Sequence, residues 1–348
     1  MPCSNPLQGY LVDIVKKSGE SGKKFLPVRT LRERFKAGLS MPVDAVGAPC
    51  RSCMPCRLEK SRVTALRCTH EARVFENNCF ITLTFNDDSL KEYMPCFDGL
   101  YSLERKIVQD FMKRLRMKFQ RGWTYVLRDG KERVCSSSEV RAYGCGEYGE
   151  ECMTCRRSRR FCVCSFFVSD LGRPHFHFCL FNCHFPDRVF EGGRDGFRYY
   201  SSKCLSSLWE YGFSSVCDFS FETAAYVARY CTKKISGEKA VKHYRGRLPE
   251  FPIYPTRGGG LGKPWFEKYG ETDVIPTDSC IARYVKCGVP EYYDRLRGRF
   301  DPDGLAEAKK IRSERAKLHV DDNTYARLQD KERCMNSKIK CLVRRLEQ

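Results

Sequence analysis

Two histidines separated by one residue are the most chemically suggestive feature of the sequence. They lie in the segment from Gly172 to Phe181, which reads Gly-Arg-Pro-His-Phe-His-Phe-Cys-Leu-Phe. Because successive side chains of a strand point to opposite faces, a strand here would place His175 and His177 on one face and apolar side chains on the other. Neutral imidazole is a common ligand of divalent metal ions, so the pair is a candidate metal site. The alternative is a pair of histidines that only form hydrogen bonds within a crowded sheet.

A carboxylate at the end of another predicted strand could complete this site. Glu147 lies in the segment Cys-Gly-Glu-Tyr-Gly, where the predicted strand 139–147 ends. Together with His175 and His177 it would supply three ligands and leave open positions for a substrate, as catalytic metal sites do. A Mg²⁺ or Mn²⁺ ion there would polarise and orient a phosphate group.

Two tyrosines in a predicted helix are candidate nucleophiles. Tyr226 and Tyr230 are four residues apart in the alanine-containing segment 222–234, so they would share one helix face. Lys233, also on that face, would favour the phenolate form of a tyrosine. Attack of a phenolate on a DNA phosphate would form a phosphotyrosine bond and release a 3′-hydroxyl, and two tyrosines would allow two successive cleavages. The alternative is a helix with two tyrosines that only pack.

The 22 cysteines indicate either buried thiols or metal thiolates. Residues 1–30 contain no segment typical of a signal peptide, and no run approaches the roughly 18 apolar residues of a membrane helix, so we expect a reduced cytosolic protein without membrane contact. Two clusters could bind structural Zn²⁺, with reduced structural cysteines as the alternative. The first is Cys50, Cys53 and Cys56, completed by Cys68 or His70; the second is Cys152, Cys155, Cys162 and Cys164.

The charge balance points to a polyanionic partner. Lys and Arg number 62 against 43 Asp and Glu, a net charge of +19, which favours nucleic acid. Three basic residues close to the candidate site are predicted to contact DNA: Arg173, Arg229 and Lys234.

Periodicity predicts an α+β chain in four parts. Strands are expected at 80–85, 123–127, 139–147, 165–169 and 213–221, and helices at 102–121 and 201–211. The parts are a loosely ordered N-terminal extension (1–48), a nicking domain with cysteine-rich segments (49–240), a loop-rich appendage (241–303) and a basic helical tail (304–348).

Several of these motifs resemble those of a known family. The strand Arg-Pro-His-Phe-His-Phe resembles the His-hydrophobic-His motif of rolling-circle replication initiators, and Tyr-x-x-x-Tyr-x-x-Lys resembles their nucleophile helix. Further segments are similar to the replication initiator of gokushovirus-type bacteriophages of the family Microviridae. These segments are Cys-x2-Cys-x2-Cys-Arg-Leu-Glu-Lys-Ser-Arg, Cys-Gly-Glu-Tyr-Gly, Ala-Ala-Tyr-Val-Ala-Arg-Tyr-x-Thr-Lys-Lys and Gly-Lys-Pro-Trp-x-Glu-Lys-Tyr-Gly.

The resemblance implies a central antiparallel sheet of about five strands flanked by helices, the HUH endonuclease fold. It also implies site-specific nicking and rejoining of replicative-form DNA at the phage origin in the cytoplasm of the infected bacterium, with a host helicase, single-strand-binding protein and DNA polymerase as partners. The segment between Glu147 and His175 is longer than the family pattern, so Glu150 is a second candidate for the third ligand. The alternative function is a non-catalytic, zinc-stabilised DNA-binding regulator; a plasmid-type initiator or conjugative relaxase would share the chemistry of nicking.

Overall fold

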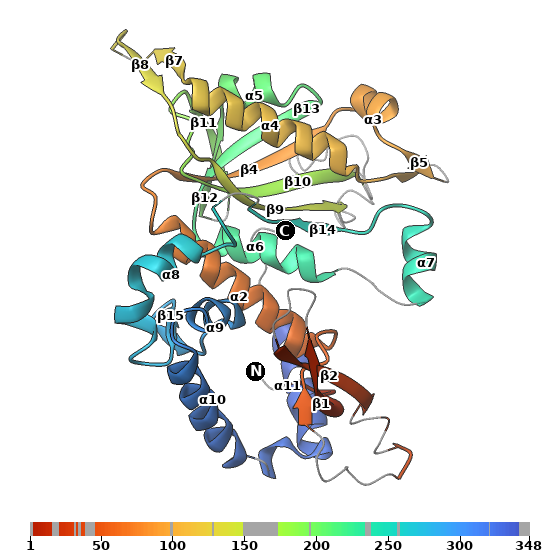
Figure 1. The fold of residues 1–348 in the computed structure, drawn as a ribbon. Helices are drawn as coiled ribbons and strands as arrows, with labels where there is room; N and C mark the ends of the chain where they lie inside the picture. Colours follow the sequence, from red (N-terminus) through yellow and green to blue (C-terminus); the bar gives the residue numbers. More distant parts are fainter. Residues whose placement is uncertain are drawn as a thin grey trace. The chain divides into compact units, whose positions relative to one another are not determined.

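The structure is a computed structural model of the 348-residue chain. It describes residues 3–15, 21–30, 33, 36–38, 46–97, 100–126, 129–148, 173–194, 196–233, 238–255, 258–319 and 321–340. The chain divides into two compact units. Figure 1 labels their helices and strands. The first unit combines Met1–Lys60 with Asp294–Gln348, and the second unit is Ser61–Tyr293.

The second unit is built on a sheet of seven strands, in which every neighbouring pair is antiparallel. The order across the sheet is β11 (Val189–Arg194), β12 (Phe197–Ser201), β13 (Gly212–Asp218), β4 (Asn78–Phe85), β10 (Pro174–Phe181), β9 (Arg141–Tyr148) and β14 (Phe251–Ile253). The predicted α+β class and antiparallel sheet are confirmed, but the expected number of about five strands was too low. The hairpin β11–β12 and the three-residue β14 were not among the predicted strands.

Helices cover both faces of this sheet, as Figure 1 shows for α4 and α6. The helices of this unit are the later part of α2 (Met54–Ala72), α3 (Asp87–Tyr93), α4 (Arg105–Arg121), α5 (Lys203–Leu208), α6 (Phe221–Lys233), α7 (Glu238–Tyr244) and α8 (Lys263–Tyr269), which continues into a π-helical turn at Gly270–Val274. Three short hairpins complete it: β5 (Cys96–Phe97) with β6 (Leu100–Tyr101), β7 (Trp123–Val126) with β8 (Glu132–Cys135), and β15 (Cys280–Ala282) with β16 (Val285–Cys287).

The alternation along β10 separates a hydrophobic core from a polar face. Phe176, Phe178 and Leu180 are fully buried in the main core, together with the apolar stripe of α4 that the i, i+4 spacing predicts. The opposite face carries His175 and His177, and the ring of His177 meets a side chain of α6. The strand therefore carries two imidazoles on one face and apolar core side chains on the other, as the sequence pattern predicted.

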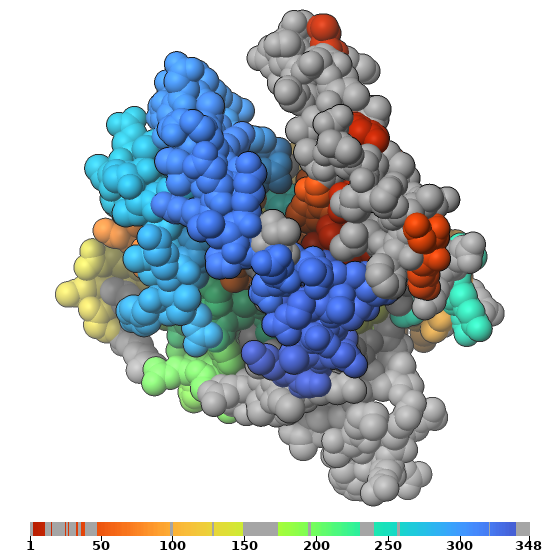
Figure 2. Space-filling model, turned by 90° about the horizontal axis from the view of Figure 1, so that it is seen from below, coloured from red at the N-terminus to blue at the C-terminus, as the bar shows by residue number. Residues whose placement is uncertain are grey.

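The first unit contains more regular structure than expected. Residues 1–48 were predicted to be loosely ordered, but β1 (Leu7–Val15), β2 (Ser21–Thr30) and β3 (Val46–Ala48) form a three-stranded sheet in the order β2–β1–β3. The described part of the C-terminal tail is helical as predicted, with α10 (Pro302–Lys317), a 3₁₀ turn at Asp321–Asn323 and α11 (Tyr325–Lys340). The helix α9 (Glu291–Arg297), across the boundary of the units, precedes this tail. Figure 2 shows the side chains of α10 and α11 at the surface.

The segment 241–303, predicted to be a loop-rich appendage, contains more regular structure than expected: the end of α7, β14, α8, the hairpin β15–β16 and α9. The predicted strand 165–169 lies outside the described residues. No helix in the described part of the chain has the length and apolar character of a membrane span.

Candidate functional site

Glu147, His175 and His177 converge in one buried cluster of the second unit. The antiparallel register pairs His175 directly with Glu147, so the carboxylate of β9 and the imidazoles of β10 share a face of the sheet. Glu147 Oε1 lies 2.6 Å from His175 Nε2 and 3.1 Å from His177 Nε2. One ligand atom from each residue lies within 4.8 Å of the others, so the group could hold a metal ion.

The hydrogen bonds of the cluster indicate that it suits a cation. His175 Nδ1 lies 3.1 Å from the carbonyl oxygen of Arg173, which can only accept, so Nδ1 carries the proton. In a neutral His175 the lone pair of Nε2 then points at the carboxylate, and two acceptors face each other. The other oxygen, Glu147 Oε2, is buried and makes no hydrogen bond to the described residues. A divalent ion would satisfy these acceptors together, so the three side chains fit a metal site.

Burial and charge set the protonation of this cluster. Burial lowers the pKa of His177, although the neighbouring carboxylate opposes this, because the charged imidazolium loses its water. For Glu147 burial raises the pKa, but the two adjacent imidazoles outweigh burial and hold it below its usual value. The result is an ionised carboxylate beside a histidine that tends to be neutral, the protonation states that metal ligands need.

Two supporting contacts orient the imidazole of His177, and the sequence reasoning missed both. Thr82 Oγ1 lies 2.9 Å from His177 Nδ1, and the ring of Phe80 stacks on His177 at a centroid distance of 5.6 Å. Both residues come from β4, where His177 is paired with Thr82. The alternation of Phe80, Thr82 and Thr84 in the predicted strand was a usable signal, but only the register shows which of them meets a histidine.

Gly146 allows the strand carrying Glu147 to approach the core closely. A Cβ atom at this position would lie 2.9 Å from the ring of Phe176 and 3.0 Å from Leu103. The absence of a side chain at Gly146 therefore lets β9 pack closely against the aromatic core. This packing fixes the position of the neighbouring residue Glu147 in the site.

A buried ion pair, also missed from the sequence, fixes the start of β9. Arg141 donates to Glu71 of α2, and both side chains are almost fully buried. Glu71 also accepts from the backbone of Gly262, and Arg141 donates to the carbonyl of Gly259 at 3.2 Å. The partners are 70 residues apart in sequence, so no local pattern could identify the pair.

The structure places Tyr226 beside the Glu147, His175 and His177 cluster. Its Oη lies 3.4 Å from His177 Nε2, and the two rings meet edge to face at 5.0 Å. At the start of the helix α6 that carries it, Ser220 and Thr223 cap each other: Thr223 N–H donates to Ser220 Oγ and Ser220 N–H donates to Thr223 Oγ1. A phenol from a distant segment thus lies within reach of the candidate metal site.

The remaining predicted site residues are placed less completely. Tyr230 and Lys233 belong to α6, but their side chains lie outside the described part of the structure, as do Lys234, Glu150 and the cluster Cys152, Cys155, Cys162 and Cys164. Arg229 is partly buried on α6. Arg173 is partly buried as well; it donates to the carbonyl of Phe85 and forms an ion pair with Asp87.

The first cysteine cluster has a different fourth member from the one predicted. Cys50, Cys53 and Cys56 lie together with Cys3, and the group could hold a metal ion. The predicted completion by Cys68 or His70 was wrong, because these residues follow Cys56 by 12 and 14 positions in the same helix α2, about 18 and 21 Å along its axis. Cys68 is fully buried, and His70 stacks on Trp265 at 3.6 Å and shares a hydrogen bond with Tyr293.

Comparison with known proteins agrees with the motifs. Residues 78–235, which contain Glu147, the histidines and α6, match the model of the family described as replication-associated protein ORF2/G2P. The chain is 28% identical to the replication-associated protein VP4 of Bdellovibrio phage phiMH2K over 73% of its own length and 69% of that protein. It is 28% identical to the replication-associated protein ORF2 of Spiroplasma virus 4 over 86% and 85%, and to ORF4 of Chlamydia phage 1 over 78% and 58%. No solved structure matches the chain significantly.

Proposed function

We propose that this chain, a homologue of the replication-associated proteins of Microviridae-type phages, initiates phage DNA replication by nicking and rejoining the origin strand. One observation carries the proposal: the hydroxyl of Tyr226 lies beside a buried carboxylate and two imidazoles that could hold a divalent ion. A nucleophile next to a candidate metal site with open positions is an arrangement suited to phosphoryl transfer.

In the proposed reaction the phenol oxygen of Tyr226 attacks a phosphorus atom of the origin strand. A bond forms between this oxygen and phosphorus, and the bond from phosphorus to the 3′-oxygen breaks. The 5′-phosphate stays on the tyrosine, the phenol loses its proton, and the departing 3′-oxygen gains one. One phosphate ester replaces another, so the step needs no nucleotide hydrolysis.

The residues of the site would divide this work. Glu147, His175 and His177 would hold Mg²⁺ or Mn²⁺, which when bound would polarise the phosphate and favour the phenolate. Thr82 and the carbonyl of Arg173 keep the two imidazoles in the orientation that points Nε2 at the carboxylate. The packing of Phe80 against His177 and Tyr226 keeps the phenol next to the cluster.

Further parts of the proposal rest on the sequence motifs. Tyr230, one helical turn from Tyr226, would make the second attack that closes the displaced circle, and Lys233 would assist the phenolate. Arg173, Arg229 and Lys234 would contact the DNA backbone. The 3′-hydroxyl would prime synthesis by a host DNA polymerase, assisted by a host helicase and single-strand-binding protein.

The test is incubation of the protein with a single-stranded oligonucleotide that carries the phage origin, in the presence of Mn²⁺. We expect a covalent adduct joined through a 5′-phosphate, seen as a slower band in a denaturing gel, and we expect Tyr226→Phe to reduce or abolish it. Tyr93→Phe, which changes an exposed tyrosine in the same unit, is the matched control and should behave as wild type.

A second arm separates catalysis from DNA binding. His177→Ala should abolish cleavage but leave salt-sensitive DNA binding largely in place. An absence of adduct in wild type, or an adduct that persists when Tyr226 and Tyr230 are both changed to Phe, would refute the nicking mechanism. DNA binding without any strand cleavage would instead favour the non-catalytic regulator.

A further inference from the structure

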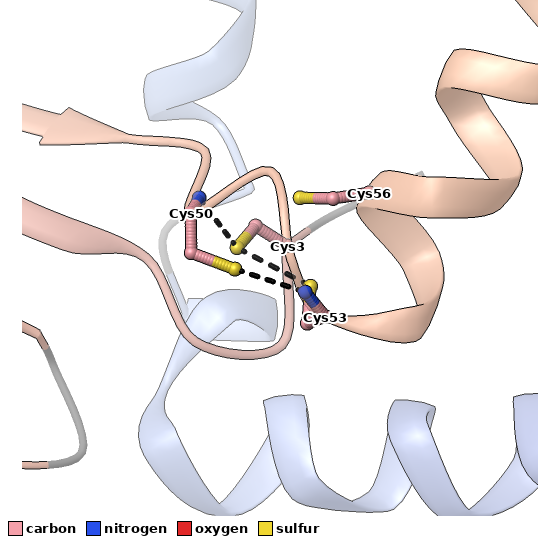
Figure 3. Close-up of side chains that lie close together, drawn as sticks. All are labelled: Cys3, Cys50, Cys53 and Cys56. Atoms are coloured by element: carbon pink, nitrogen blue, oxygen red, sulfur yellow. Dashed lines mark hydrogen bonds between the residues drawn. The ribbon is translucent and has the colours of Figure 1, made fainter. Parts of the chain in front are cut away.

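Four thiols gather in the first unit, and none of them belongs to the residues of the proposed reaction. Cys3 precedes β1, Cys50 follows β3, Cys53 immediately precedes α2, and Cys56 lies in the first turn of α2. Figure 3 shows their side chains turned toward one another. The sulfur atoms lie within 4.8 Å of one another, and all four residues are partly exposed.

The spacing of the sulfur atoms matches a tetrahedral thiolate site better than a disulfide. Cys3 Sγ and Cys53 Sγ are 3.6 Å apart. A tetrahedral Zn²⁺ site with Zn–S bonds of about 2.3 Å places its sulfurs about 3.8 Å apart. A disulfide needs about 2.05 Å, and the four residues are free cysteines.

Backbone donors around the cluster favour negatively charged sulfur. The amide of Cys50 donates to Cys3 Sγ at 3.3 Å, and the amide of Cys53 donates to Cys50 Sγ, also at 3.3 Å. Between Cys50 and Cys53 the chain turns through Arg51, which has a positive φ of 61°. Cys53 and Cys56 also lie at the N-terminal end of a 19-residue helix, where the helix dipole stabilises thiolates.

A metal ion at these cysteines would add to the contacts that hold the N-terminal segment of the first unit. In its described part, the buried large apolar side chains are Leu296, Leu305 and Leu328. Structural zinc contributes folding energy directly, so an ion at the cysteines would stabilise this segment. The carbonyl of Ser4, next to Cys3, also accepts from Gln329 of α11 at 3.5 Å, so a tie at Cys3 would stabilise this contact as well.

We propose that Cys3, Cys50, Cys53 and Cys56 bind one Zn²⁺ ion that fastens the N-terminal segment to the start of α2. We assign Zn²⁺ because a site closed by four cysteine thiolates is a ligand set of structural zinc sites, which are not catalytic. Iron is the other metal that a tetrahedral set of four thiolates selects. The proposal does not depend on the nicking reaction, because none of its residues belongs to the cluster of Glu147, His175, His177 and Tyr226.

The test compares the zinc content of full-length variants by mass spectrometry of the metal. Cys3→Ser should contain one Zn²⁺ per chain less than wild type. Cys334→Ser, which changes an exposed cysteine of the same unit, should keep the wild-type content. The difference between variants is the readout, so zinc held by residues outside the described ranges does not affect it.

Two further measurements distinguish the loss of a zinc ligand from misfolding of the variant. Cys3→His supplies another zinc ligand and should retain the ion that Cys3→Ser loses. Limited proteolysis should cut the N-terminal segment of Cys3→Ser faster than that of wild type or Cys3→His. Unchanged zinc in Cys3→Ser, iron in place of zinc, or a disulfide within the cluster in freshly purified protein would overturn the proposal.

Discussion

Replacing Glu147 by glutamine isolates the charge of the candidate metal site from its shape. The amide is nearly isosteric with the carboxylate, and its N–H group can donate to His175 Nε2, which faces this position as an acceptor. Because burial lowers the pKa of His177, the histidine left behind tends to be neutral, and the variant does not strand a buried charge. Without added metal we therefore expect stability to change by only about 1 kcal/mol, the worth of one hydrogen bond.

The effect of added metal should be much larger, and the structure allows it to be worked out. The ligands are 28 and 30 residues apart, so the unfolded chain does not preserve the site and metal binds the folded state selectively. At about 100 times the Kd this stabilises the folded state by about 2.7 kcal/mol. For a unit of about 230 residues each kcal/mol raises Tm by about 2–4 °C, so Mn²⁺ should raise the Tm of wild type by about 5–11 °C.

Thermal unfolding with and without Mn²⁺ measures this shift. Wild type should show it, Glu147→Gln should lose most of it, and Glu132→Gln, which changes an exposed carboxylate of β8, should keep it. A Mn²⁺-dependent shift of wild-type size in Glu147→Gln would refute the reasoning that this carboxylate is a metal ligand.

Two other predictions concern the groups around the site and the packing of the second unit. Thr82→Val removes the hydrogen bond to His177 Nδ1 while keeping the side-chain volume, and should weaken Mn²⁺ binding by about 10-fold, measured by titration calorimetry, without abolishing it. Burial, followed by the charge of Arg73, lowers the pKa of His70 from 6.5 to about 3, so between these values the unfolded chain binds a proton that the folded protein excludes. The free energy of unfolding should therefore fall as the pH drops below 6.5, by up to about 1.4 kcal/mol per pH unit. Urea unfolding of His70→Gln should show a smaller dependence on pH. An identical dependence in the variant would contradict the conclusion that His70 is the group responsible.

Much of the local structure follows from patterns that depend only on neighbouring residues. The alternation from Arg173 to Phe181 correctly predicted a strand with two histidines on one face, because side-chain direction in a strand depends only on parity. The i, i+4 stripe of residues 102–121 predicted α4, and the alanine-containing segment 222–234 predicted α6. One of the strands missed in the seven-stranded sheet is β14, because it is three residues long and its pairing partner, β9, lies about a hundred residues earlier.

The sequence determined which chemically reactive residue types are present. The tertiary structure determined which of these residues contact one another. The sequence alone determined that a His-x-His strand, a Gly-flanked glutamate, a tyrosine helix and a Cys-x2-Cys-x2-Cys run exist. Only the fold decided that Glu147 pairs with His175, that Tyr226 reaches His177 across 49 residues, and that Cys3 rather than Cys68 joins the cysteine cluster. The physical reason is that strand register and helix docking are set by burial of the whole core, which no local spacing encodes.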